Sequence, residues 1–418
     1  MRVFPKVFRV GKKQRIFYRS EKEAKTVEIR IYGMERYSLP RTERMRIDEE
    51  ARHPFLPMER VGEGVYAIDF DFPVEQRYTF RILEDGQHGA YGRLYAVSDD
   101  LFELGFFKGD THLHSCRSDG VGEPFEVALD YRREGFDFIC LTDHHRYAPS
   151  LEARDAIAPL TEAFIVFPGE EVHNKDMGYI HIVNFAGNAS VNDIIENRPD
   201  YVKARIEEMA AALTLPADVD PATTLFRLFI TDEIRRVGGL AVLAHPYWDT
   251  GGEYSMETAE AIYHLKNGSF DAIELLASDD CVGNGDNLQV ALYYELREEG
   301  IRTPILGASD RHDPKNPASH FHRHFSLVFA HDATAIPDAV RHGMSVAVNR
   351  RSDSDFFVFG SYRLVKYARF LLDEFYPHYK LLAARHADAM AQACGKRNEG
   401  IAAAEAKIYA FRSDFFAG

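Results

Sequence analysis

The stretch from Gly109 to Tyr147 constrains the fold more than any other part of the chain. It opens with His112 and His114, which project from the same face of an extended segment and can reach one metal ion. The helical pattern PFEVALDYRRE then leads, after Gly135, to the apolar run FICL and the sequence TDHH. This order predicts a strand–helix–strand unit of a parallel sheet. Ligands of such sheets bind at the carboxyl ends of the strands, where both histidine groups fall.

The same alternation of strands and helices continues to about residue 350. Apolar runs predict strands at 164–167, 179–185, 240–244, 272–276, 304–306 and 325–329. Helical spacing is found at 191–212, 224–237, 257–266 and 287–299. Residues 107–350 are therefore expected to form one barrel-like α/β domain.

The flanking parts of the chain have different patterns. Residues 1–106 contain short alternating runs separated by Gly, Pro and Asp turns, which predicts a β-sandwich domain. It holds no group of metal ligands, so we expect a structural or oligomerising role. Residues 351–418 have helical spacing, with one helix around 364–375 and a second at about 378–394. We expect this C-terminal helical extension to pack on the barrel or on a partner subunit of a homo-oligomer.

Composition narrows the classes of partner. The formal net charge of −15 disfavours a broad nucleic-acid surface and favours a small-molecule substrate. The four cysteines are scattered without a CxxC pair, which argues against a zinc ribbon or a disulfide framework and fits a cytoplasmic protein. The N-terminus lacks the apolar core of a signal peptide and no run of 18 apolar residues occurs, so no membrane association is expected.

Four further groups of potential ligands lie at or after apolar runs. They are Glu171 in PGEE, His181 in GYIHIVNF, His245 in LAHPYW, and the pair Asp310 and His312 in ILGASDRH. A lone histidine in an apolar strand is usually a core residue, and His181 alone would be read so. Carboxylate and imidazole together make a mixed ligand set suited to zinc, manganese or iron. The full candidate set is His112, His114, Asp119, His144, Glu171, His181, His245, Asp310 and His312.

HLHSCRSDG followed by LTDHH resembles the PHP (polymerase and histidinol phosphatase) family of metal-dependent hydrolases. The PGxE motif and the later histidines look closest to the carbaryl-hydrolase-like branch of stand-alone enzymes. The resemblance covers residues 107–350 and implies a distorted (β/α)7 barrel. One position departs from the pattern, because the family commonly has TDHD where this chain has His145. His145 is either a proton donor to the leaving group or an ordinary loop residue.

The resemblance also implies how two or three divalent ions (Zn, Mn or Fe) would be shared among the nine residues. One ion would be held by His112, His114, Glu171 and Asp310. Glu171 would bridge to a second ion, bound also by His181 and His245, while Asp119, His144 and His312 would hold a third. Asp110, Asp143 and Ser309 are expected to support these ligands from behind, since ligating imidazoles commonly donate to a carboxylate or carbonyl.

Adjacent divalent ions lower the pKa of a shared water to about 7, so such a centre predicts hydrolysis by a metal-bridging hydroxide. The cations Arg117, Arg146, Lys175 and Arg311 lie beside the ligands and favour a phosphoester substrate, since guanidinium groups bind phosphate in a bidentate manner. Arg146 and Arg311 join His145 as candidate catalytic residues, although strand alternation could equally aim Arg311 into a structural salt bridge. Two alternatives stay open: cleavage of an ester, amide or carbamate, and a non-catalytic metal-binding module.

Overall fold

The computed structural model describes residues 2–35, 53–174, 180–249, 251–277, 284–313, 323–352 and 354–416. The chain divides into two compact units. The first comprises Met1–Leu104, Lys366–Tyr379 and Ala406–Gly418, and the second comprises Gly105–Val365 and Lys380–Glu405. The C-terminal segment beyond residue 365 is therefore divided between the two units.

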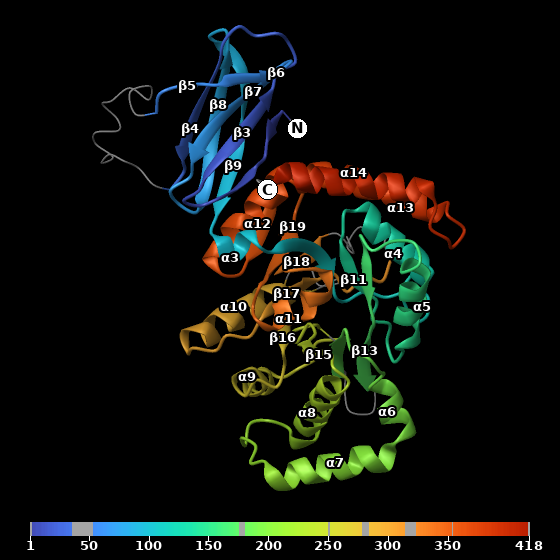
Figure 1. The fold of residues 1–418 in the computed structure, drawn as a ribbon. Coiled ribbons are helices and arrows are strands. Elements are labelled where there is room, and N and C mark those ends of the chain that lie inside the picture. The colour runs from blue at the N-terminus through green and yellow to red at the C-terminus, as the bar shows by residue number, and fades with distance from the viewer. Residues whose placement is uncertain are drawn as a thin grey trace. The chain divides into compact units, whose positions relative to one another are not determined.

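Two β-sheets form most of the first unit (Figure 1). The first has the order β1 (Val3–Phe4), β3 (Lys13–Arg19), β7 (Val65–Asp71) and β6 (Glu59–Gly62). The other has the order β2 (Val7–Arg9), β9 (Gln87–Val97), β8 (Gln76–Glu84), β4 (Val27–Gly33) and β5 (Leu56–Pro57). Side chains of both sheets, such as Ile16 and Phe80, fill one buried core. The short helix α3 (Asp99–Phe102) follows β9.

The second unit is a mixed α/β structure with two further sheets. The six-stranded sheet has the order β12 (Ile165–Phe167), β11 (Phe138–Cys140), β10 (Gly105–Asp110), β18 (His324–Ala330), β19 (Ser345–Arg350) and β20 (Phe356–Phe359). The five-stranded sheet has the order β13 (Gly169–Asn174), β14 (Ile180–Phe185), β15 (Leu240–Leu243), β16 (Ala272–Ala277) and β17 (Ile305–Ala308). Residues from both sheets, among them Phe138 and Val242, share a buried core.

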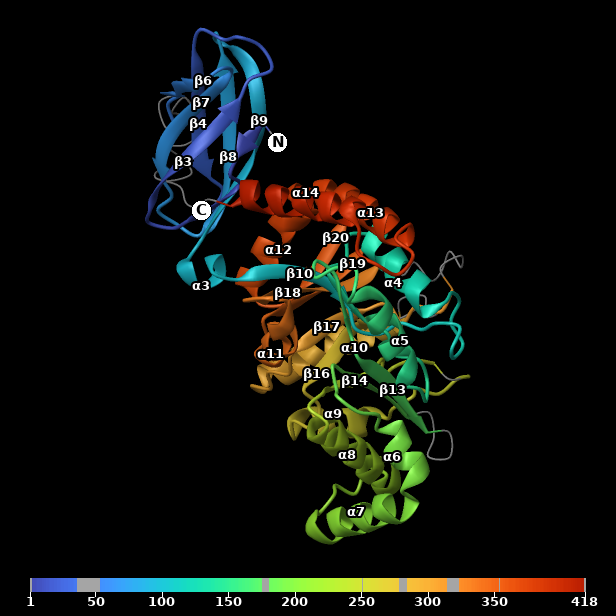
Figure 2. The same cartoon turned by 45° about the vertical axis from the view of Figure 1, so that its right-hand side comes forward.

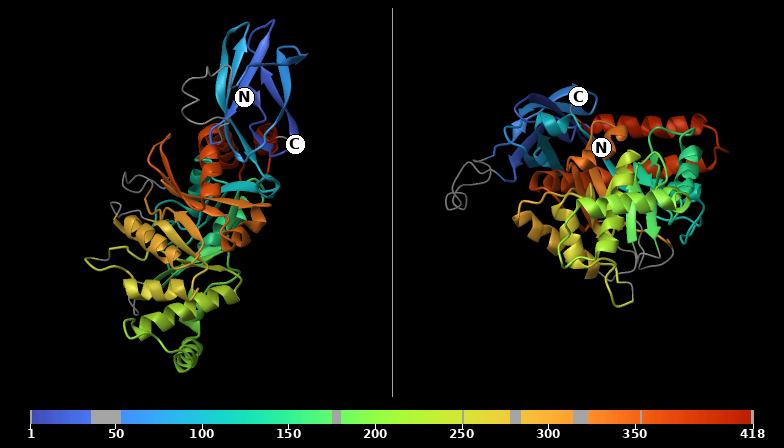
Figure 3. Two further views of the ribbon diagram at one scale, coloured as in Figure 1. Left: turned by 90° about the vertical axis from the view of Figure 1, so that its left-hand side faces the viewer. Right: turned by 90° about the horizontal axis from the view of Figure 1, so that it is seen from below.

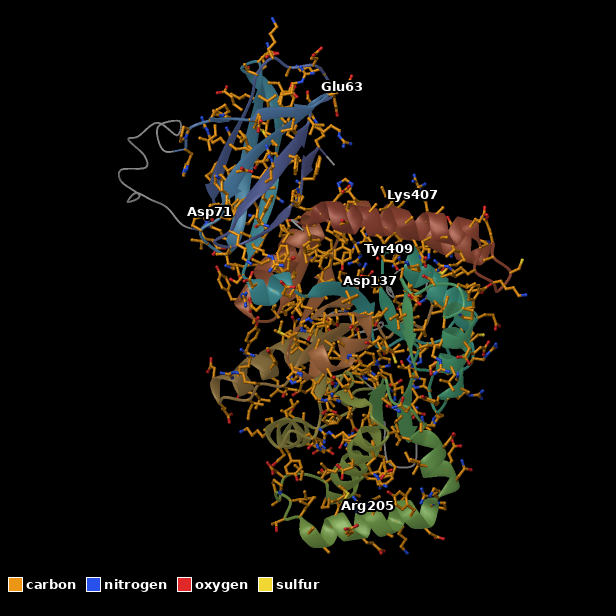
Figure 4. All side chains as sticks on the ribbon, in the orientation of Figure 1. Glu63, Asp71, Asp137, Arg205, Lys407 and Tyr409 are labelled. Carbon is orange, nitrogen blue, oxygen red and sulfur yellow. The ribbon has the colours of Figure 1, made fainter. Side chains whose placement is uncertain are left out.

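Strands β10, β11 and β12 are mutually parallel, as are β15, β16 and β17. The connection between β10 and β11 is α4 (Pro124–Arg133), so the predicted strand–helix–strand unit is present. Asp137, labelled in Figure 4, precedes β11 and accepts a hydrogen bond from the backbone N–H of Lys108 at 3.0 Å. In contrast, β13 and β14 pair antiparallel, which the alternation of strands and helices did not predict.

Helices cover the outer faces of these sheets. They are α5 (Ala148–Ile157), α8 (Pro221–Arg236), α9 (Thr258–Lys266), α10 (Asn284–Glu298) and α11 (Ile336–Arg341), together with η1 (Ala333–Ala335). The helix expected at 191–212 is broken into α6 (Asn192–Asn197) and α7 (Pro199–Ala212), because Pro199 disfavours helical backbone at Arg198 and cannot donate a hydrogen bond. Helix α7 packs on α8 and lies farther from β15 than α8 does (Figure 1). Figure 2 and the left view of Figure 3 show α7, in green, at the lower end of the second unit.

Three helices follow residue 361: α12 (Tyr362–Glu374), α13 (Tyr376–Ala391) and α14 (Glu399–Phe415). The first two match the helical patterns expected there. The third was not predicted, although its alanine-rich sequence favours a helix. In the described part of the chain, no helix combines the length and the apolar character needed to cross a membrane.

The contact between Gly109 and Phe138 offers a test of how β10 packs on β11. A Cβ atom at Gly109 would lie 2.0 Å from the Phe138 ring, which is fully buried. We therefore expect Gly109→Ala to lower the free energy of unfolding by about 1–3 kcal/mol through overpacking. Urea denaturation would measure this loss. The double variant with Phe138→Leu should lose less than the sum of the two single losses, and strict additivity would contradict the contact.

Candidate metal centre

Most candidate ligands lie beyond the ends of strands of the second unit, while Glu171 and His181 lie within β13 and β14. His112 and His114 follow β10, and the intervening Leu113 forms a parallel bridge with Arg311, just beyond β17. A second parallel bridge joins His144, beyond β11, to Glu171 on β13. These bridges align the chain segments beyond the strands, so histidines and carboxylates from segments far apart in sequence meet at one place.

Glu171 is the centre of the cluster. Its carboxylate is fully buried, and its Oε2 lies 2.8 Å from His144 Nδ1 and 3.2 Å from His112 Nε2. Its Oε1 lies 2.7 Å from His181 Nδ1 and 3.4 Å from His245 Nε2. His114 Nε2 lies 3.5 Å from Oε2. Each oxygen of one carboxylate therefore faces a different group of imidazoles, as expected for a bridging ligand.

Asp310 and Asp119 complete the cluster. Asp310 Oδ1 lies 3.0 Å from His114 Nε2 and 3.2 Å from His112 Nε2. Asp119 Oδ2 lies 3.4 Å from His144 Nε2 and 3.5 Å from His312 Nε2. All nine candidate ligands are thus brought together by the fold.

Three sets of these donors are compact enough to hold a metal ion, since the ligand atoms in each set lie within 4.8 Å of one another. The sets are His112, His114, Glu171 and Asp310; His144, Glu171 and His181; and His114, Asp119, His144 and His312. These sets differ from the distribution expected above in two ways. His144 takes the place given to His245 beside Glu171 and His181, and His114 joins Asp119, His144 and His312.

The hydrogen bonding of the cluster fits a cation. Both Glu171 oxygens and the buried nitrogens of His112 (Nε2), His114 (Nδ1), His144 (Nδ1) and His245 have no hydrogen bond of regular geometry. Buried polar groups are normally satisfied, and leaving one unpaired costs about 1–3 kcal/mol. A divalent ion would accept lone pairs from several of these oxygens and nitrogens together. The unpaired atoms are therefore better satisfied with a bound metal ion than without one.

The carboxylates are held in their charged form. Burial alone would raise the pKa of Glu171, but the histidines His181, His144 and His112 outweigh it and lower the pKa well below its usual range. Asp310 behaves in the same way, because His112 and His312 overcome the effect of burial and lower its pKa. Charged carboxylates are the state that a metal ion requires.

Backbone strain accompanies the site. Asp310 has a φ of 49° and His145 a φ of 58°, both in the left-handed region that residues with a Cβ seldom occupy. The backbone N–H of Asp310 donates to the carbonyl of His112 at 2.9 Å, which holds this conformation. Such strained residues cluster at functional sites, where the surrounding structure maintains them.

Two buried carboxylates fix the loops behind the ligands, but through backbone N–H groups and not, as had been expected, through the ligand imidazoles. Asp143 accepts hydrogen bonds from the backbone N–H groups of Ser115 and Ser118, each at 3.0 Å. Asp110 accepts from the N–H groups of His112 at 3.2 Å and Ser309 at 3.1 Å, and so ties the two loops together. A third carboxylate, Glu274, contacts His112 and was not predicted from the sequence. Its only sequence signal is a lone charge in the apolar strand AIELLA.

The predicted cations do not all face the centre. Arg311 is 1% exposed and pairs with Asp130 at 3.0 Å, so the structure favours the structural salt bridge over contact with a substrate. This is a correction to the candidate catalytic set. Arg117 pairs with Glu123 and Glu152. Arg146 is exposed, and Lys175 lies outside the described residues.

His145 lies beside the cluster. Its ring stacks on that of His173 with centroids 4.6 Å apart, and the His173 ring lies 4.4 Å from that of His181. Burial and the neighbouring His181 lower the pKa of His173 to about 3, so this imidazole stays neutral.

Comparison with known proteins gives a local match. No family model matches the chain. It is 42% identical over 103 residues to the DNA polymerase/3'-5' exonuclease PolX of Bacillus subtilis (strain 168), which is 21% of this chain and 18% of that protein. The chain therefore aligns with less than a fifth of this relative, whose whole activity cannot be transferred directly.

Solved structures show weaker likenesses. A two-domain protein of Bacteroides vulgatus, described as containing a predicted PHP-like metal-dependent phosphoesterase, has a TM-score of 0.41 and 18% identity over 59% of this chain and 65% of its own. An amidohydrolase from Chromobacterium violaceum has a TM-score of 0.32 and 20% identity over 51% of this chain and 90% of its own.

Glu171 and its neighbour Glu170 provide a matched test of metal binding. Glu170 is equally buried, but its carboxylate accepts hydrogen bonds from Ser190 at 2.8 Å and Asn192 at 2.9 Å instead of facing the histidines. We expect added Zn²⁺ or Mn²⁺ to raise the Tm of metal-free wild type and of Glu170→Gln, because a ligand that binds only the folded state stabilises it. Glu171→Gln should lose most of this shift. Differential scanning calorimetry would measure it, and an equal shift in both variants would contradict the role of Glu171.

Proposed function

We propose that this protein is a metal-dependent hydrolase of the PHP superfamily that cleaves a small phosphorylated substrate. The observation that carries the proposal is the buried Glu171 carboxylate, whose two oxygens face separate groups of imidazoles. The PHP-type motifs read from the sequence support it. At the finer level we propose a distorted (β/α)7 barrel, preceded by a β-sandwich, with the carbaryl-hydrolase-like branch as its nearest kin.

In this proposal two or three divalent ions occupy the centre. His112, His114 and Asp310 would hold one, His181 and His245 a second, and Glu171 would serve both. Asp119, His144 and His312 would hold a third. Bound ions of this kind supply a water of lowered pKa and neutralise charge that develops on the group under attack.

The substrate would approach from the side of His145 and Arg146. Both residues line a cavity of about 640 Å³, together with Arg117 and the acids Glu152, Asp193 and Glu196. The described lining includes none of the nine candidate ligands, so the link from this cavity to the metal centre is part of the proposal. Arg146 makes no ion pair within the described ranges, so its guanidinium is available to bind phosphate oxygens. His145, next to the ligand His144, would give a proton to the leaving group in this proposal.

The relative from Bacillus subtilis adds support, because the name of that protein includes a 3'-5' exonuclease, and exonucleases hydrolyse phosphodiester bonds. Arg311 is buried and pairs with Asp130, so one of the cations that favoured a phosphorylated substrate does not support it. For that reason hydrolysis of an ester, amide or carbamate by the same centre is the second candidate.

Parallel assays separate these two reactions. Purified protein loaded with Mn²⁺ or Zn²⁺ should hydrolyse p-nitrophenyl phosphate or bis-p-nitrophenyl phosphate faster than p-nitrophenyl acetate, as followed by released nitrophenolate. Asp310→Asn should abolish turnover while the circular dichroism spectrum is retained, because a ligand carboxylate is lost. Preference for the acetate would favour the second candidate. Inactivity on all three substrates with metal bound would contradict both.

The role of Arg146 has its own test. Arg146→Ala should lower kcat/KM for the phosphoester about 10- to 100-fold, the equivalent of one charge-assisted hydrogen bond of about 1.5–3 kcal/mol. Turnover of p-nitrophenyl acetate should change little. Arg154→Ala is the control, since Arg154 lies on α5, which begins two residues after Arg146, and pairs with Asp155 at 2.8 Å. Equal effects of both variants would remove Arg146 from the site.

A further inference from the structure

Glu274 is a buried carboxylate that the proposed chemistry leaves without a role. It lies in the middle of β16, where every residue of AIELLA is buried, and its own side chain is 0% exposed. A charge in such surroundings costs several kcal/mol unless hydrogen bonds compensate it. The compensating groups come from two of the candidate ligands.

One oxygen of Glu274 faces the ring of His112, with Oε1 2.9 Å from Nδ1. The other oxygen accepts a hydrogen bond from the backbone N–H of His245, at 3.3 Å. On the far side of the His112 ring, Nε2 lies 3.2 Å from both Glu171 and Asp310. A single side chain therefore contacts two segments that supply ligands, one after β10 and one after β15.

We propose that Glu274 is a positioning residue that sets the tautomer of His112 and the place of His245 for metal binding. This inference rests on the metal centre of the proposed function. An ionised carboxylate only accepts hydrogen bonds, so it keeps the proton of His112 on Nδ1 and leaves the Nε2 lone pair directed at Glu171 and Asp310. The carboxylate also makes the imidazole a more basic ligand.

The local backbone explains how Glu274 reaches both partners. The register of β16 against β17 shifts between Glu274 and Leu276, which pair with Leu306 and Gly307, so Leu275 is an extra residue. Such a bulge turns side chains away from regular alternation, and bulges are frequent beside active sites. The buried side chain of Gln289 on α10 donates to the carbonyls of Glu274 at 2.9 Å and Leu275 at 3.2 Å, and so supports the bulge.

The test compares metal binding by Glu274→Gln with that of a matched control. The control, Glu260→Gln, also removes a buried carboxylate of the second unit. Glu260, on α9, pairs with Arg227, on α8, at 2.6 Å. Metal-free proteins are titrated with Co²⁺ and followed by the visible absorption of bound cobalt, and their thermal unfolding is recorded in parallel. We expect Glu274→Gln to bind Co²⁺ about 10- to 100-fold more weakly than wild type, with a changed cobalt spectrum. Glu260→Gln should bind as wild type does.

The other outcomes contradict either the positioning role of Glu274 or the proposed metal centre. Wild-type affinity and an unchanged cobalt spectrum in Glu274→Gln would overturn the positioning role, even if its thermal stability falls. Failure of the wild type itself to bind Co²⁺ would instead contradict the proposed function. If Glu274→Gln does not fold, Gln289→Met tests the same idea, because it removes the support of the bulge and leaves Glu274 in place. Weaker Co²⁺ binding by Gln289→Met would support the inference, and unchanged binding would overturn it.

Discussion

The structure depends on one electrostatic constraint, the burial of the Glu171 carboxylate among five imidazoles. A charged group removed from water must be compensated, and here the compensation comes from histidines on four separate segments of the chain. The same histidines keep the pKa of Glu171 low. Because many of their buried nitrogens lack a regular hydrogen bond, the protein alone satisfies this arrangement incompletely, and a divalent cation would complete it.

Strands and the loops that follow them hold the histidines and carboxylates around Glu171. Ligands lie at the ends of β10, β11, β15 and β17 or within β13 and β14, so their positions follow from strand pairing. The loops that carry them are tied by buried carboxylates, as Asp110 ties the loop of His112 to that of Ser309. Asp310 has a strained, left-handed backbone conformation, and its carboxylate contacts His112 and His114.

The sequence predicted the site best where potential metal ligands directly follow an apolar run. HxH and TDHH could be placed at strand ends because each follows an apolar run, and the fold does bring them together. It predicted least about side chains whose partners are distant in the sequence. Arg311 pairs with an aspartate nearly two hundred residues away, which local spacing cannot reveal. Glu274 lies at a bulge, and Gln289 bonds to its carbonyl; neither feature leaves a sequence pattern. Pro199, in contrast, was a visible breaker within the predicted long helix.

The most direct test of the account is anomalous X-ray scattering at the zinc, iron and manganese edges, on crystals of protein supplied with these metals. The account predicts two or three peaks around the Glu171 carboxylate, at distances of about 2.0–2.3 Å from carboxylate oxygens and imidazole nitrogens. One of these ions should contact His112 Nε2 and Asp310. Density for metal elsewhere, with none within ligand distance of Glu171, would contradict the central claim.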